Sequence, residues 1–120
     1  MSIRLAQNTY VEHRPRKGWC VFSSIHLRKG QLVEEAPVLP CPWDGPSSIL
    51  DDYRMTWDGK EDCLTLGNIN LMNHSTDAPN VHVVNNHKRL TKQVFALRNI
   101  RRGEELCFTY QCPIWFAEEP

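Results

Sequence analysis

The run Gly-Glu-Glu-Leu-Cys-Phe-Thr-Tyr at positions 103–110 decides the fold of this 120-residue chain more than any other stretch. A glycine after two arginines is typical of a turn, and the residues behind it are β-prone, so a strand is predicted over 105–110. A second phrase, Leu-Arg-Lys-Gly-Gln-Leu-Val-Glu-Glu at 27–35, has the same order of basic residue, glycine and acidic strand. By themselves the two phrases indicate β-turns in which Gly30 and Gly103 adopt positive φ.

Further β-prone runs flank these phrases and predict a mainly β fold with few short helices. Four prolines between 37 and 46 predict a loop there, because proline is excluded from most positions of a central strand. Ser48, followed three residues later by Asp51, resembles a helix N-cap, so a short helix is predicted over 48–56. The other predicted strands are 20–25, 31–36, 81–86 and 93–98.

The length and composition are those of one small domain, which we expect to span 1–120. The apolar share of 41% is ordinary, and 14 basic residues balance 14 acidic ones, which disfavours direct binding of nucleic acid. A core of this size is modest, and a homodimer would enlarge it. Because we find neither a secretion signal nor a membrane span, we expect an intracellular protein, cytoplasmic in a bacterium or nuclear in a eukaryotic or virus-infected cell.

Five cysteines are spread along the chain without a paired framework, so we expect reduced thiols rather than disulfides. A structural zinc site needs four closely placed ligands, and Cys107 with Cys112 supplies only two. The sequence therefore predicts no metal ligands.

Four motifs then follow one another in the order of a known family. The first is Gly-Trp-Cys-Val-Phe at 18–22, and the second is Lys-Gly-Gln-Leu-Val-Glu-Glu at 29–35. The third is Asn-His-Ser at 73–75 with Pro-Asn at 79–80, and the fourth is the run 103–110. Each is weak alone, but their order and spacing resemble the SET domain along nearly the whole chain. The likeness is greatest to the short stand-alone SET proteins of viruses and bacteria.

The resemblance implies several small β-sheets and a C-terminal pseudoknot, in which the Asn-His-Ser segment and the final strand pass each other. It implies a protein-lysine N-methyltransferase that uses S-adenosylmethionine and acts on a basic tail such as that of a histone. Neither a pre-SET domain nor a zinc-binding post-SET domain is expected. The chain departs from the family pattern at Cys20, where a glycine is usual, at Asn70-Leu71 in place of Arg-Phe, and by one extra residue before Pro79.

The catalytic role falls by resemblance on Tyr110, whose hydroxyl would orient the attacking amine beside the methyl group. Tyr53 resembles a second active-site tyrosine, with a plain helix-face aromatic as the alternative. Phe108 stands two residues before Tyr110, where the family controls the number of methyl groups added. A phenylalanine leaves open the space that a tyrosine hydroxyl would restrict, so we expect di- and trimethyl-lysine. Phe108 can also be a core aromatic of an alternating strand.

The resemblance also names residues that bind the cofactor. Asn73 is expected to hold its methionine part, because an amide offers both a donor and an acceptor. His74 is expected to act through its main chain and a structural hydrogen bond rather than as a proton carrier. The other expected cofactor residues are Gly18, Trp19 and Cys20, through backbone groups, and Tyr110.

Two regions keep alternative interpretations. Trp115 and Phe116 are candidates to cover the adenine or the lysine channel, with packing into the core or a dimer interface as the alternative. The five acids between 51 and 62 form either a solvated loop or a rim that attracts a basic tail. Glu104 and Glu105 are interpreted as turn charges.

Two other functions stay open at this point. One is a SET-like module that binds partners or cofactor without turnover, since fold alone does not determine function. The other is a methyltransferase whose acceptor is not lysine. The sequence names neither the substrate protein nor the modified residue.

Overall fold

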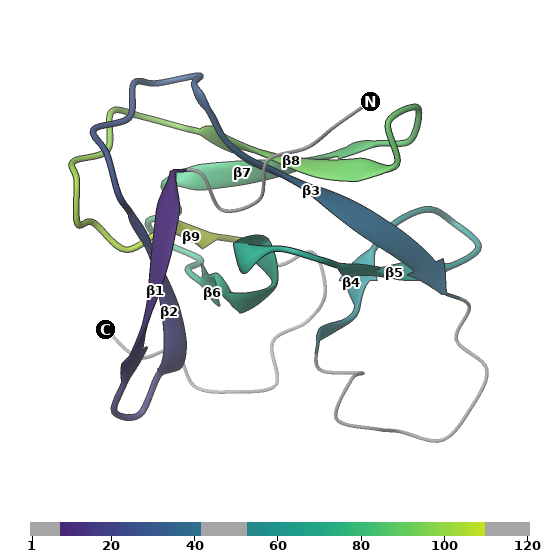
Figure 1. The fold of residues 1–120 in the computed structure, drawn as a ribbon, viewed down its shortest axis with the longest axis horizontal. Coiled ribbons are helices and arrows are strands. Elements are labelled where there is room, and N and C mark those ends of the chain that lie inside the picture. The colour runs from purple at the N-terminus through teal and green to yellow at the C-terminus, as the bar shows by residue number, and fades with distance from the viewer. Residues whose placement is uncertain (1–7, 42–52, 110–120) are drawn as a thin grey trace.

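A computed structural model of the chain describes residues 8–41 and 53–109. Figure 1 shows short strands joined by long connections. The strands of the described residues form three sheets, and Asn68–Leu71 form a turn of 3-10 helix. The described elements are β1 (Thr9–Arg14), β2 (Gly18–Ser23), β3 (Leu32–Cys41), β4 (Met55–Thr56), β5 (Asp62–Thr65), η2 (Asn68–Leu71), β6 (Asn73–His74), β7 (Val81–Asn86), β8 (Thr91–Ala96) and β9 (Cys107–Phe108). The predicted fold class, mainly β with several small sheets, is confirmed.

The largest sheet has five strands in the order β4-β5-β3-β8-β7, and its strand pairs are antiparallel. β3 is its central strand and changes partner halfway along. Its first half pairs with β8, as in Leu32↔Phe95, and its last four residues pair with β5, as in Val38↔Thr65. This change of partner lets one ten-residue strand connect both halves of the sheet.

The prediction of a loop at 37–46 was wrong for the part that the structure describes, because β3 continues through Pro37 and Pro40 to Cys41. Val38 N donates to Leu90 O at 3.1 Å and Leu66 N donates to Pro37 O at 2.9 Å. In an antiparallel ladder these bonds place Pro37, opposite Thr91, and Pro40, opposite Cys63, at non-hydrogen-bonded positions. Pro40 therefore lacks no N–H that β5 would need, and Pro37 lacks none that β8 would need, because its nitrogen faces Leu66, one residue beyond the end of β5.

Two smaller sheets complete the fold. β1 and β2 form an antiparallel hairpin, in register from Thr9↔Ser23 to Arg14↔Gly18. β6 and β9 pair in parallel, with Asn73 opposite Cys107 and His74 opposite Phe108. The segments whose passage past each other the resemblance implied are thus neighbours, although they lie far apart in the sequence.

The main core lies where these sheets meet. Its buried residues come from β2, β3, η2, β7, β8 and β9 and from the loops beside them, so no single sheet encloses it. They are Val21, Leu27, Val33, Ala36, Ile69, Met72, Val81, Val94, Ala96, Ile100, Leu106 and Phe108. A smaller cluster of Val38, Trp57 and Cys63 lies at the β4–β5 end of the large sheet.

The other local predictions had mixed outcomes. Gly30 and Gly103 have φ of 84° and 88°, which confirms both predicted turns. The five predicted strands correspond to β2, β3, β7, β8 and β9, with ends shifted by several residues in some of them. The helix predicted over 48–56 was wrong at its end, because Met55–Thr56 form the strand β4. Residues 48–52 lie outside the described part of the chain.

Candidate functional site

The site is built where β2, β6 and β9 meet, at the ends of three of the sequence motifs. The segment before β9 continues beside β2, because Leu106 N donates to Val21 O at 2.8 Å and Ser23 N donates to Glu104 O at 2.9 Å. On its other side β9 lies against β6, and Ser75 N donates to Phe108 O at 3.1 Å. Residues 103–109 are therefore held between the first and the third motif.

Asn73 lies at the centre of this contact. Its amide nitrogen Nδ2 donates to Glu105 Oε2 at 2.7 Å and to Cys20 Sγ at 3.3 Å. A carboxamide nitrogen has two protons, so both are used within the protein. The Asn73 oxygen Oδ1 has no hydrogen-bond partner among residues 8–41 and 53–109, and it can accept a hydrogen bond from a ligand.

Glu105 connects Asn73 to the β1–β2 hairpin through Lys17. Its Oε1 accepts a hydrogen bond of 2.8 Å from Lys17 Nζ, and the two side chains are 20% and 24% exposed. Burial disfavours the charged carboxylate, but the hydrogen bonds from Asn73 and Lys17 outweigh burial, so the pKa of Glu105 lies below its ordinary value. The same hydrogen bond raises the pKa of Lys17. At neutral pH the two groups form an ion pair.

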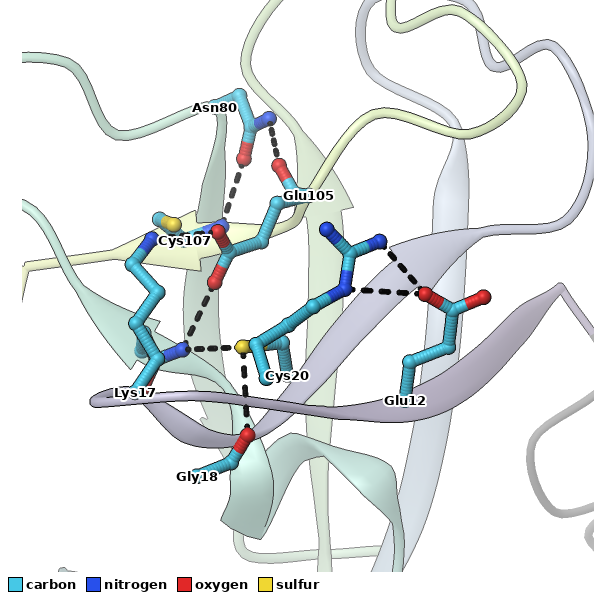
Figure 2. Close-up of polar contacts among 9 residues, drawn as sticks. Glu12, Lys17, Gly18, Cys20, Asn80, Glu105 and Cys107 are labelled. Carbon is cyan, nitrogen blue, oxygen red and sulfur yellow. Dashed lines mark hydrogen bonds and ion pairs between the residues drawn. The ribbon is translucent and has the colours of Figure 1, made fainter. Parts of the chain in front are cut away.

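Asn80 holds the strand that carries Glu105. Its Nδ2 donates to the Glu105 carbonyl at 2.8 Å, and its Oδ1 accepts from Cys107 N at 2.9 Å, as Figure 2 shows. Its own N–H donates to Cys107 O at 3.0 Å. Because Asn80 is only 4% exposed, water does not readily replace these bonds. Asn80 thus sets the path of the chain on both sides of Leu106.

Two thiols lie in the same group. Burial, followed by the charge of Glu105, raises the pKa of Cys20, and the same causes raise the pKa of Cys107 to about 12. Both side chains are therefore neutral thiols at physiological pH, whereas a cysteine nucleophile needs the thiolate. The site is not built for covalent catalysis by these cysteines. Cys20, Cys41, Cys63 and Cys107 are free thiols in the described part of the chain.

Gly18 and Trp19 begin β2 at the edge of the site. Gly18 has φ of 77°, and no atom lies within 4 Å of the place where a Cβ would be. Trp19 is 52% exposed and makes an edge-to-face contact with His13, their ring centroids 5.4 Å apart. A ligand can therefore approach the backbone here without displacing a core residue.

The structure describes three further predicted site residues, His74, Phe108 and Tyr53. His74 follows Asn73, and its Nε2 lies 2.7 Å from Thr76 Oγ1. Phe108 is 8% exposed and belongs to the main core, so the core alternative is correct at least in part. Tyr53 is 40% exposed just before β4, and the hydrogen bonds around Asn73 do not include it. Tyr110, Trp115 and Phe116 lie outside the described residues.

The arrangement suits the methyl donor that the resemblance implies. Asn73 Oδ1 is an available acceptor, the Glu105 carboxylate is beside it, and the Gly18 backbone is open. An acceptor next to a negative charge favours a ligand group that is a cationic donor. The amino-acid part of S-adenosylmethionine carries an ammonium group of this kind, so the residues present fit this cofactor.

Sequence reasoning missed three residues of this site. Glu105 was interpreted as a turn charge, an interpretation that fits only Glu104, whose Oε1 accepts from Arg101 N at 3.1 Å within the turn. Lys17 received no role, and Asn80 was quoted in a motif without one. A signal for Glu105 was its place beside Leu106 inside the strand predicted over 105–110.

Two features, a metal-binding group of side chains and a membrane-spanning helix, are absent from the described part of the chain. No group of three or more His, Cys, Asp or Glu side chains within 8–41 and 53–109 is arranged to hold a metal ion. In the same residues there is no helix with the length and hydropathy of a membrane span.

Comparison with known proteins agrees with this geometry. The SET domain family matches residues 18–111. The chain is 29% identical over 114 residues to the histone-lysine N-methyltransferase of Schizosaccharomyces pombe that is specific for H3 lysine-37, covering 91% of this chain and 77% of that one.

Two solved structures have the same fold. A crystal structure of a Plasmodium falciparum protein described as a histone methyltransferase has a TM-score of 0.72 at 27% identity, over 95% of this chain and all of that one. KRYPTONITE, in complex with DNA, an H3(1–15) peptide and SAH, has a TM-score of 0.69 at 25% identity. That match covers 98% of this chain and 26% of KRYPTONITE.

Proposed function

The chain belongs to the SET-domain family, and from this premise we propose that it methylates a lysine in the basic tail of a histone. It is a protein-lysine N-methyltransferase, and its methyl donor is S-adenosylmethionine. The relative from Schizosaccharomyces pombe acts on histone H3, and the KRYPTONITE complex holds an H3 peptide. These two proteins support a histone tail as the substrate class.

One observation carries the proposal for the site. The parallel pair β6–β9 holds Asn73 opposite Cys107, and Thr109 Oγ1 donates to Ser75 O at 2.9 Å. Tyr110 follows Thr109 directly in the sequence. The residue proposed to bind cofactor and the strand that leads to the residue proposed to catalyse are therefore held together.

The reaction needs two things from the protein, a neutral acceptor amine and the alignment of the reacting atoms. The acceptor lysine must be neutral, although its ordinary pKa of about 10.4 leaves roughly one amine in a thousand uncharged at neutral pH. An apolar channel lowers that pKa by desolvating the ammonium form. S-adenosylmethionine, when bound, supplies a methyl group on a cationic sulfur for in-line attack. Alignment of the reacting atoms then lowers the activation free energy by several kcal/mol.

We assign these tasks to residues as follows. Tyr110 orients the amine, Phe108 shapes the channel and leaves room for di- and trimethyl-lysine, and Tyr53 is the second tyrosine of the active site. Trp115 covers part of the bound cofactor. The cofactor is held by Asn73, His74, Tyr110 and the backbone of Gly18, Trp19 and Cys20.

The test is mass spectrometry of an H3 peptide incubated with S-adenosylmethionine and either the natural protein or Tyr110→Phe. We expect methyl-lysine from the natural protein, no product from a lysine-to-arginine peptide, and at least about a tenfold lower turnover for the variant. Calorimetry should show that Tyr110→Phe still binds S-adenosylhomocysteine.

Each alternative gives a different result. Cofactor binding without turnover on any peptide would indicate a non-catalytic module, and methylation of the arginine control would indicate another acceptor. Equal turnover by Tyr110→Phe would remove Tyr110 from the mechanism. The homodimer and the intracellular location stay predictions, to be checked by light scattering and by imaging of the tagged protein.

A further inference from the structure

We propose that Glu105 and Lys17 are positioning residues that fix the orientation of the Asn73 carboxamide in the cofactor site. The inference rests on the proposed function, because Asn73 matters here as a ligand of S-adenosylmethionine. It concerns neither catalytic chemistry nor contact with the substrate. Glu105 and Lys17 act through Asn73.

An asparagine side chain has two orientations that differ by a half-turn of the amide and exchange its donor and its acceptor. Here Nδ2 donates to Glu105 Oε2 at 2.7 Å and to Cys20 Sγ at 3.3 Å. The half-turn would place Oδ1 against the Glu105 carboxylate, where two acceptors repel each other. Glu105 therefore selects the orientation that leaves Oδ1 available.

Lys17 keeps Glu105 ionised, and the ionised carboxylate is the form that selects one orientation of the Asn73 amide. A protonated Glu105 could donate a hydrogen bond and would tolerate either amide orientation. The ion pair with Lys17, 2.8 Å long and largely shielded from solvent, favours the carboxylate. Lys17 reaches it from the turn between β1 and β2, which is 88 residues away in the sequence. The hairpin thereby influences the Asn73 side chain of β6 through Glu105.

The chosen orientation determines what Asn73 recognises. With both amide protons used, Asn73 offers a ligand only an acceptor, and the neighbouring carboxylate adds negative potential. This combination favours the ammonium group of the cofactor and disfavours its carboxylate. The opposite amide orientation would reverse this preference.

The same motif contains a matched control. Glu104 also makes an ion pair, 2.9 Å long, with Arg98. That pair is more exposed than the Lys17–Glu105 pair and holds only the turn through Arg101 N. Substitution of Glu104 removes a similar charge from the adjacent position without a change at Asn73.

The first experiment measures the affinity of the full chain for S-adenosylhomocysteine by calorimetry, without substrate. We expect about tenfold weaker binding for Glu105→Gln, since a charge-assisted hydrogen bond is lost, and a smaller loss for Lys17→Met. Glu104→Gln should stay within about twofold of the natural protein. In turnover assays the KM for cofactor should rise in Glu105→Gln, while kcat at saturating cofactor changes little.

The decisive variant exchanges the two charges, Lys17→Glu with Glu105→Lys. It can restore the ion pair and, with it, the free energy of unfolding. The ammonium group introduced in place of the Glu105 carboxylate would nevertheless donate where the carboxylate accepts, so the Asn73 amide would turn and affinity should stay low. Recovery of affinity together with stability would overturn the inference, because the pair would then be only structural.

The outcomes separate this inference from the proposed function. A natural protein that fails to bind S-adenosylhomocysteine would contradict both. Normal binding by the natural protein and by Glu105→Gln would contradict only the positioning role. Urea unfolding of every variant shows whether a loss of affinity reflects loss of the fold.

Discussion

Two regions of this small protein are held together in different ways. The five-stranded sheet of β4, β5, β3, β8 and β7 has antiparallel pairing with a register shift between Leu32 and Glu34, and valine and alanine side chains are buried against it. The crossing region, which we define as β2, β6, Asn80 and residues 104–108, contains strands of only two residues in β6 and β9. Polar side chains supply much of its connection, through Asn73, Asn80 and Glu105.

This difference in how the two regions are held together predicts different effects of mutation in each. In the sheet, the loss of one side chain costs burial but leaves the backbone ladder intact. In the crossing region, the loss of one amide leaves buried backbone groups without partners and changes the geometry around Asn73. We therefore expect mutations in the sheet to affect stability alone and mutations in the crossing region to affect stability and cofactor binding together.

The largest effect is expected from Asn80→Ala. It leaves the Glu105 carbonyl and the Cys107 N–H without their buried partners, which should lower the free energy of unfolding by about 3 kcal/mol. Affinity for S-adenosylhomocysteine should fall as well. Urea unfolding and calorimetry measure the two quantities. Asn99→Ala, an exposed asparagine whose Oδ1 accepts from Lys29 N, is the control and should cost less than about 1 kcal/mol.

Val94→Ala in β8 should have the next largest effect. Val94 is fully buried in the main core, and its truncation should cost about 2 kcal/mol through lost burial and a small cavity. Cofactor affinity should not change at a temperature where the variant is folded. Val84→Ala, at a 39% exposed position of β7, is the control and should cost much less. A large loss of affinity in Val94→Ala would contradict the separation of the two regions.

The smallest effects are expected where the two regions meet, at adjacent glutamates of β3. Glu34 is 4% exposed and accepts from Asn68 N at 3.1 Å and Ile69 N at 2.7 Å, which joins the sheet to η2 just before β6. Burial raises its pKa above the ordinary 4.5, against the effect of these hydrogen bonds. Glu35 pairs instead with Arg89 at 2.7 Å, and the hydrogen bond from Arg89 lowers its pKa.

The two glutamates should therefore give opposite pH dependences. A raised pKa means that the folded state binds the proton more tightly, so Glu34 adds stability below pH 4.5 and loses that contribution as pH rises through its folded pKa. Glu35 adds stability above pH 4.5 and loses it as pH falls through its lowered pKa. Unfolding of Glu34→Gln and Glu35→Gln, each relative to the natural protein across this range, should show slopes of opposite sign. Slopes of the same sign would contradict the assignment.

Much of the sheet was predictable because its strands follow local rules. β7 was predicted with its observed ends, 81–86, and the turns at Gly30 and Gly103 were predicted from residue type alone. β1, β4, β5 and β6 were not predicted. A two-residue strand such as β6 has no periodicity to recognise, and its position depends on β9, which it contacts across the fold.

The prolines of β3 also show that the sequence alone does not give the strand register. Their presence correctly excludes positions where a partner strand needs an N–H, but the sequence does not say which positions those are. That depends on the register with β5 and β8, which places Pro37 where β8 needs no N–H and Pro40 where β5 needs none. The loop prediction failed because it treated a positional rule as a general one.

The sequence by itself determined the family, through four motifs in order, and with it the fold class and the reaction. It also predicted Asn73 as a cofactor residue. Only the tertiary structure decided which atom of Asn73 is left for a ligand, because that depends on Glu105 and Cys20, which approach from other strands. Motifs record which residues are present along the chain. Hydrogen bonds between distant segments depend on strand pairing, and strand pairing exists only in the folded protein.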